Sequence, residues 1–176
     1  SWSQETLNKA ASQNKWILIS IGYSTCHWCH VMEKEIFEDV DIADKMNQYF
    51  INIKVDREEY PDVDNAYMSA AIALTGTGGW PLNMVCLPNA KPIWASTYLP
   101  KENWVRAINK LHEINIKSPD IAEEYAEKLI TALNDEKDKS YPLNKNISWV
   151  NFKEKTISKW DSDFGGTKGS PKFPMP

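Results

Sequence analysis

The hydrophobic positions of the chain follow two spacings, and their alternation predicts strands separated by helices. Residues 16–21 form a nearly continuous apolar run, which is typical of a strand buried on both faces of a sheet. Residues 51–55 alternate apolar and polar side chains, which predicts a second strand. Two more strands are expected at 82–87 and 93–98, joined by turn-forming residues at 88–91.

The segments between these strands carry apolar residues at helical spacing. Helices are expected at residues 4–13, 26–38, 42–50, 61–74, 102–115 and 119–134. In the second of these, Trp28, Met32 and Ile36 recur every four residues and predict its buried face. In the last, Ile121 and Tyr125 begin the predicted apolar stripe.

The order of elements predicts an α/β fold with a mixed central sheet flanked by helices and an antiparallel edge hairpin. Residues 1–134 are expected to form this domain. Residues 135–146 are polar and aperiodic, which predicts a linker. Residues 147–176 contain a short predicted helix and a glycine-rich stretch, with too little apolar content to fold alone.

Composition narrows the classes of function. The chain has 176 residues, 42% of them hydrophobic, which is enough for one domain with a core. The net charge is −4 and the basic clusters are short and mixed with acids, so no nucleic-acid partner is expected. No apolar run is long enough to cross a membrane, so no membrane partner is expected either. The chain begins at Ser1 and stops at Pro176 without obvious boundaries, so we expect a segment of a longer protein.

Two of the three cysteines lie three residues apart, at the junction of a predicted strand and a predicted helix. Unpaired backbone N–H groups at a helix start favour a thiolate, and His27 and His30 add to this effect when protonated. We therefore expect the pKa of the Cys26 thiol to lie below about 8.5, the value of a free thiol. Helical geometry turns Cys29 toward the side of Met32, so Cys26 is expected to be exposed and Cys29 shielded.

This arrangement predicts a thiol–disulfide oxidoreductase that needs no cofactor. Cys26 would attack a protein or small-molecule disulfide, and Cys29 would then resolve the mixed disulfide. The reverse direction would oxidise a dithiol substrate. Too few cysteines are present for a secreted disulfide scaffold, so a reducing, cytoplasmic location is expected.

Three other interpretations remain open at this point. A zinc site would use Cys26 and Cys29 with His27 or His30, and the only other candidate ligands are Cys86 and His112. The string Cys-His-Trp-Cys-His also fits the short haem-attachment pattern. The domain could instead be a non-enzymatic module that docks a partner protein. Cys86 is more simply a small core residue, and His112 a half-buried packing residue.

A longer stretch, from Ser20 to Met32 (SIGYSTCHWCHVM), closely resembles the spermatogenesis-associated protein 20 family, also called YyaL-like proteins. Further matching segments are KVDREE at 54–59, PDVD at 61–64, YM at 67–68, LTG at 74–76 and GGWP at 78–81. The tail from Asp163 to Pro174 is similar to the start of that family's second domain, an α/α toroid like those of six-hairpin glycosidases. The resemblance implies that residues 1–134 are a thioredoxin-like domain and that residues 147–176 are the start of a second, truncated toroid domain. It also implies that this C-terminal toroid domain is the partner of the first domain.

The wider thioredoxin superfamily implies a cis proline opposite the cysteine pair, and Pro81 matches that position. The backbone of the preceding residue, here Trp80, is then expected to bind substrate. His27 and Trp28, which lie between the cysteines, are also expected to contact substrate.

The chain departs from thioredoxins at two places. Ser20 stands where thioredoxins have a buried aspartate that accepts a proton, and His27-Trp28 replaces Gly-Pro. Asp56, at the carboxyl end of its strand, could take over proton transfer or could simply cap the following turn. The charged run 57–59 is interpreted as a solvated loop.

Overall fold

The computed structural model describes residues 2–137, 149–163 and 165–168. The chain divides into two compact units, Ser1–Asp138 and Lys139–Pro176. The first unit contains the sheet and the cysteine pair.

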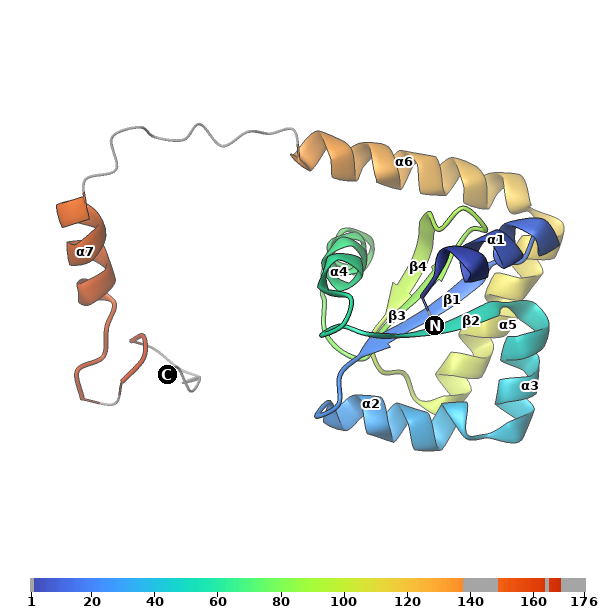
Figure 1. Ribbon diagram of the computed structural model, residues 1–176, viewed down its shortest axis with the longest axis horizontal. Coiled ribbons are helices and arrows are strands. Elements are labelled where there is room, and N and C mark those ends of the chain that lie inside the picture. The colour runs from blue at the N-terminus through green and yellow to red at the C-terminus, as the bar shows by residue number, and fades with distance from the viewer. Residues whose placement is uncertain (1, 138–148, 164, 169–176) are drawn as a thin grey trace. The chain divides into compact units, whose positions relative to one another are not determined.

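Helices and strands follow one another in the first unit in the predicted order (Figure 1). In chain order they are α1 (Gln4–Gln13), β1 (Ile17–Gly22), α2 (His27–Met32), the π-helical turn η1 (Glu33–Phe37), α3 (Val40–Tyr49), β2 (Ile51–Asp56), α4 (Pro61–Thr75), β3 (Leu82–Cys86), β4 (Pro92–Ser96), α5 (Lys101–Lys117) and α6 (Pro119–Lys137). The side chain of Ser3 accepts a hydrogen bond from a backbone N–H of α1, and that of Asp39 accepts one from a backbone N–H of α3. These caps explain where the two helices begin.

The strands form a mixed sheet in the order β2-β1-β3-β4. β1 pairs with β2 in parallel and with β3 antiparallel, and β3 and β4 form an antiparallel hairpin at one edge. The predicted fold class is therefore confirmed. β4 ends at Ser96, two residues before the expected end of that strand.

β1 is buried on both faces because successive side chains of a strand point to opposite sides of a sheet. Ile17, Ile19 and Ile21 belong to one core cluster, whereas Leu18 packs with Trp16 in the other. This is why the segment reads as a continuous apolar run rather than as an alternating one.

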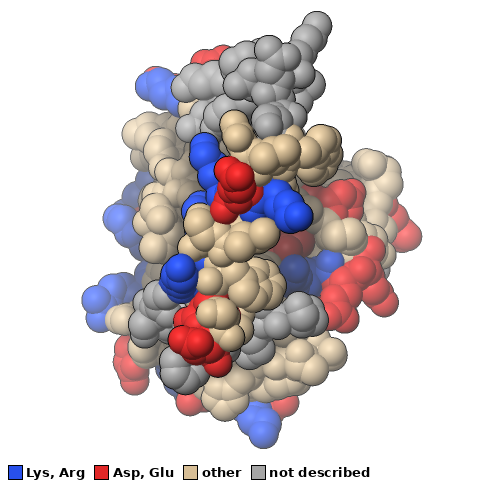
Figure 2. All heavy atoms as spheres, turned by 90° about the vertical axis from the view of Figure 1, so that its left-hand side faces the viewer, with Lys and Arg blue, Asp and Glu red and all other residues tan. Residues whose placement is uncertain are grey.

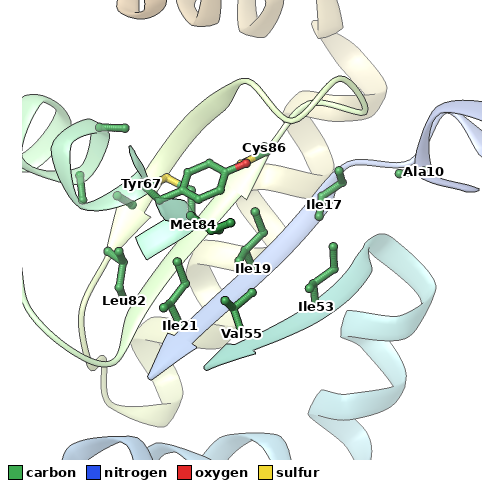
Figure 3. Close-up of a cluster of buried hydrophobic side chains, with 14 residues drawn as sticks. Ala10, Ile17, Ile19, Ile21, Ile53, Val55, Tyr67, Leu82, Met84 and Cys86 are labelled. Atoms are coloured by element: carbon green, nitrogen blue, oxygen red, sulfur yellow. The ribbon is translucent and has the colours of Figure 1, made fainter. Parts of the chain in front are cut away.

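The first cluster joins β1, β2 and β3 to α4 through Tyr67 (Figure 3). The Tyr67 hydroxyl points toward Cys86 and donates a hydrogen bond to the carbonyl oxygen of Ala90 at 3.0 Å. Cys86 is fully buried, which confirms its expected place in the core. Burial raises the pKa of both the Cys86 thiol and the Tyr67 phenol.

The apolar stripe predicted for the last helix (Ile121, Tyr125, Leu129 and Leu133) is wrong in its first half, whereas Leu133 packs against the first core cluster. Ile121 and Tyr125 are exposed, whereas Ala122 and Ala126 are buried in the second cluster. α6 lies against α4, α5 and β4, and small side chains allow this close approach. Ile121 and Tyr125 consequently turn toward solvent.

The topology brings three chain segments to one edge of the sheet, the edge at which the parallel strands β1 and β2 end, rather than the lateral edge formed by β4. Gly22 and Asp56 are paired residues at the carboxyl ends of the parallel strands β1 and β2. β3 runs the other way, so its first residue, Leu82, pairs with Ile21 at the same edge. The turn that holds the cysteines, the β2–α4 loop and the segment before β3 therefore meet there.

The end of α6 changes the predicted boundary between the domains. Residues 135–137 of the predicted linker are helical, because α6 extends to Lys137. The remainder of that linker, at 138–146, lies outside the described residues.

The second unit contains α7 (Trp149–Ser158), which corresponds to the predicted short helix, and a β-bridge between Trp160 and Thr167. Residues 147–148, 164 and 169–176 of the expected second domain lie outside the described part of the chain. The toroid interpretation of this unit stays a prediction.

Charged side chains of both signs are interspersed with uncharged ones on the face shown in Figure 2. This agrees with the mixed charge pattern of the sequence. Among the described helices, none combines the length and the apolar character that crossing a membrane requires.

Candidate functional site

The cysteine pair lies where β1 ends and α2 begins. Cys26 is the N-cap residue of α2, with extended backbone angles (φ −77°, ψ 104°). It forms a disulfide bond with Cys29, with a Cα–Cα distance of 5.2 Å. The backbone N–H of Cys29 also points at the Cys26 sulfur, at 3.2 Å. An otherwise unpaired helix N–H group thus donates to the sulfur that is expected to carry charge.

The helix that carries Cys29 is anchored by its apolar side. α2 continues directly into η1, and together they cover residues 27–37 of the predicted helix 26–38. Met32 and Ile36 are fully buried, as their spacing predicts, but Trp28 is 52% exposed. Its ring contacts His27 and Tyr98 at the surface instead of the buried residues of either core cluster.

The predicted exposure of the two cysteines is wrong. Cys26 is only 3% exposed, whereas Cys29 is partly exposed and lines a surface pocket. The prediction treated Cys26 as a residue within the helix. As an N-cap with extended backbone, its side chain turns back over the helix start instead of following the helical rotation.

The pocket beside Cys29 has a volume of about 370 Å³ and lies at the sheet edge described above. Pro81, Asp56 and Ser20 line it together with Cys29. Four of the predicted site residues, Cys29, His30, Asp56 and Pro81, are thus brought together from three separate segments of the chain.

Pro81 is buried, and the Trp80–Pro81 peptide bond is cis. The indole of Trp80 turns away from the pocket and packs against the first core cluster, where its N–H donates to Asp64 at 2.8 Å. Trp80 and Pro81 therefore differ in placement: the proline lines the pocket and the indole does not.

His27, Trp28 and His30 are exposed at the start of α2. His27 is exposed and meets Trp28 edge to face, with ring centroids 5.6 Å apart. Trp28 also packs on Tyr98 at 4.9 Å. His30 lines the pocket, and its Nε2 lies 2.8 Å from the carbonyl oxygen of Ser24.

Asp56 makes the contact of a turn cap and also faces the pocket. Its Oδ1 accepts the backbone N–H of Glu58 at 2.8 Å. It lines the same pocket as Cys29 and Ser20. Both interpretations of Asp56 that the sequence left open are therefore compatible with its position.

An ion pair that the sequence did not indicate borders the same pocket. Lys54 of β2 donates to Glu33 at 2.6 Å, and both side chains are partly exposed. This hydrogen bond is the main reason why the pKa of Glu33 lies below its usual value. Exposed pairs of this kind contribute little to stability, about 0–1 kcal/mol.

Sequence reasoning missed a second group of residues beside the site. Asp64 is 3% exposed and holds both Trp80 and Arg57, which was interpreted as part of a solvated loop. The available signal was a carboxylate between Val63 and Tyr67, two residues of the buried stripe of α4. A buried carboxylate requires partners, and here they come from the loop before α4 and the segment after it.

The two further candidate zinc ligands, Cys86 and His112, do not lie beside the cysteine pair. Cys86 is in the core, and His112 stacks on Tyr49 with ring centroids 3.7 Å apart, as expected of a packing residue. Within the described ranges, no group of three or more His, Cys, Asp or Glu side chains could hold a metal ion.

A family model named Thioredox_DsbH, described as "Protein of unknown function, DUF255", matches residues 1–141. Spermatogenesis-associated protein 20 from Homo sapiens is 36% identical to this chain over 186 residues. The protein of the same name from Rattus norvegicus is 34% identical over 186 residues. Each alignment covers 99% of this chain and 24% of the relative, so the chain spans about a quarter of the length of these relatives.

Solved structures show the same fold at low sequence identity. The structure described as "DsbH Oxidoreductase" matches with a TM-score of 0.53 and 15% identity, over 65% of this chain and 85% of that one. A thioredoxin from Thermus thermophilus matches with a TM-score of 0.53 and 14% identity, over 64% and 85% of the two chains. The predicted thioredoxin-like fold is confirmed. Because the family model matches most of its length, the chain belongs to the Thioredox_DsbH family, in agreement with the resemblance to spermatogenesis-associated protein 20.

Proposed function

We propose that this domain is a thiol–disulfide oxidoreductase that uses the Cys-His-Trp-Cys pair. One observation carries the proposal: the bonded pair lies at a helix start, and the N–H of Cys29 points at the sulfur of Cys26. The same N–H would stabilise the thiolate that forms when the bond is reduced. Cis Pro81, at the same sheet edge, supports the proposal.

The reaction begins from the reduced pair. The Cys26 thiolate attacks one sulfur of a substrate disulfide; the Cys26–substrate bond forms and the substrate's other sulfur leaves as a thiolate, which takes up a proton. Cys29 loses its proton and attacks the Cys26 sulfur, so that the second substrate thiolate leaves. Two electrons pass from the protein dithiol to the substrate, and the disulfide between Cys26 and Cys29 forms. The reverse sequence oxidises a dithiol.

The proposal also covers the substrates, a partner domain and the cellular compartment. A thioredoxin-like fold favours protein or small-molecule disulfides and dithiols as substrates. The curated relatives are about four times longer than this chain, so a further domain is proposed as an intramolecular partner. A reducing compartment such as the cytoplasm would keep the pair ready to donate electrons.

A second candidate is a docking module with little turnover. Trp28 is half exposed beside the disulfide and packs on Tyr98, and exposed aromatic side chains of this kind are common at protein interfaces. The two candidates predict different results for turnover with the cysteines intact.

The test is the reduction of insulin by the 176-residue chain, with dithiothreitol as the electron donor. We expect Cys26→Ser to abolish the reaction and Cys86→Ala, the matched control in the core, to retain it. In a separate reaction without dithiothreitol, reduced Cys29→Ser should accumulate a mixed disulfide with the substrate. A parent chain that accelerates nothing over dithiothreitol alone contradicts the enzyme and favours the docking module.

A further inference from the structure

A buried carboxylate near the site has no part in the disulfide chemistry. Asp64, in the first turn of α4, is 3% exposed. Burying a charge is costly unless it is paired and hydrogen-bonded. Asp64 meets that condition with two partners: its Oδ1 accepts the indole N–H of Trp80 at 2.8 Å, and its Oδ2 lies 3.6 Å from Nε of Arg57.

Arg57 holds the same indole from another side. Its guanidinium carbon lies 3.9 Å from the ring centroid of Trp80, a cation–π contact. Tyr23 meets the indole edge to face at 5.9 Å and lies 5.6 Å from the Arg57 guanidinium. The backbone N–H of Arg57 donates to the carbonyl oxygen of Gly22 at 2.9 Å, which fixes the start of this loop to the end of β1. We call Arg57, Asp64 and Tyr23 the indole clamp.

The clamp acts on the residue that precedes the cis proline. The Trp80 indole is absent from the lining of the pocket that contains Cys29 and Pro81, so its bulk does not fill that pocket. Within the described part of the chain, the backbone N–H and C=O of Trp80 have no hydrogen-bond partner. A main-chain donor and an acceptor are therefore left unpaired beside the disulfide, on a residue whose side chain is held by three others.

We propose that Asp64 and Arg57 are positioning residues: by fixing the Trp80 indole, they hold the Trp80 backbone where it can pair with the main chain of an extended substrate peptide. This inference rests on the proposed function for its consequence in turnover. Its consequence for peptide binding stands without turnover. Small disulfides, which have no peptide main chain to pair, would gain nothing from the clamp.

The first experiment is an NMR titration of the oxidised chain with an uncharged nonapeptide that has serine in place of cysteine. The expected result is a shift of the Trp80 backbone N–H signal that saturates, with an affinity weakened about tenfold in Asp64→Ala and in Arg57→Ala. No shift of that signal in the parent chain overturns the inference, whether or not the chain is catalytically active. Equal affinity in parent and variants overturns it as well.

The second experiment separates positioning from a general structural role. In Asp64→Ala, KM for insulin should rise about tenfold while kcat changes little, and the rate with 2-hydroxyethyl disulfide should fall far less. Asp64→Asn keeps an acceptor for the indole N–H and should restore part of the loss. Asp62→Asn removes the same charge at an exposed position of the same helix turn and is the matched control.

Parallel losses with both substrates in Asp64→Ala would assign the residue to folding alone and would overturn the inference. An inactive parent chain that still binds the peptide at Trp80 would instead contradict the proposed function and leave the clamp supported. The two failures are therefore distinguishable.

Discussion

The α-carbon of Gly22 lies directly against the sulfur of Cys29. A Cβ atom at position 22 would come within 2.9 Å of that sulfur, closer than real Cβ contacts allow. Because the sulfur is bonded to Cys26, it cannot rotate to another position. β1 therefore ends in glycine because the disulfide occupies the space that a side chain would need.

Replacement of this glycine should favour the dithiol over the disulfide. In Gly22→Ala the overpacking, about 1–3 kcal/mol, falls on the oxidised form, because the reduced Cys29 thiol can rotate away. The dithiol–disulfide equilibrium, measured against dithiothreitol, should shift roughly 5- to 150-fold toward the dithiol. Urea unfolding of the reduced variant is the control and should show a much smaller loss of stability. An unchanged equilibrium would mean that β1 moves aside at no cost.

The sheet and the cysteine pair could be predicted because local sequence determines them. The apolar run of β1 and the alternation in β2 follow from strand geometry, and a C-x-x-C pair after a strand places Cys29 in a helix. The exposure of Cys26 could not be predicted in the same way. It depends on the N-cap backbone angles, which a helical wheel does not describe.

The remaining misses come from tertiary packing. Ala122 and Ala126 are buried because neighbouring elements approach α6 closely, and a hydrophobic stripe alone favours the larger Ile121 and Tyr125. In the sequence, Asp64 resembles any acidic residue at the start of a helix. Its partners, Arg57 and Trp80, come from two other segments of the chain. Contacts of this kind appear only when the chain is folded.

The thiol of Cys26 should ionise more readily than a free thiol in the reduced chain. In Cys29→Ser the backbone N–H of residue 29 is retained, so the anion at Cys26 remains stabilised. Alkylation by iodoacetamide requires the thiolate, so its rate should reach a plateau at lower pH, with a midpoint below about 8.5. The same variant in guanidinium chloride is the control and should titrate near the free-thiol value. Identical midpoints in both conditions would contradict the helix-start argument.

Cys86 should not react in the folded chain. Burial raises the pKa of its thiol, and the neighbouring Tyr67 hydroxyl offsets only part of that increase. After reduction, mass spectrometry should therefore find alkylation of Cys26 and Cys29 in the native chain, with Cys86 modified only after unfolding. Rapid native labelling of Cys86 would show that this part of the core opens.

Asp56 should accelerate the step in which Cys29 attacks the mixed disulfide. The step can be observed directly after Cys26 is loaded with 5-thio-2-nitrobenzoate, because the attack releases a coloured thiolate. Asp56→Asn keeps an acceptor for the N–H of Glu58, so the turn is retained, but it cannot accept a proton. If Asp56 takes the proton of Cys29, release near neutral pH should slow about tenfold, and the difference should shrink as hydroxide removes the proton instead.

The sign of this effect separates proton transfer from a simple charge effect. Loss of a negative charge near Cys29 would by itself lower the pKa of that thiol and speed the release. Glu59→Gln removes a charge from the same pocket without altering the strand end, so it should leave the rate unchanged or raise it slightly. Faster or unchanged release in Asp56→Asn would therefore leave Asp56 with the turn cap alone, and a solvent molecule would have to accept the proton.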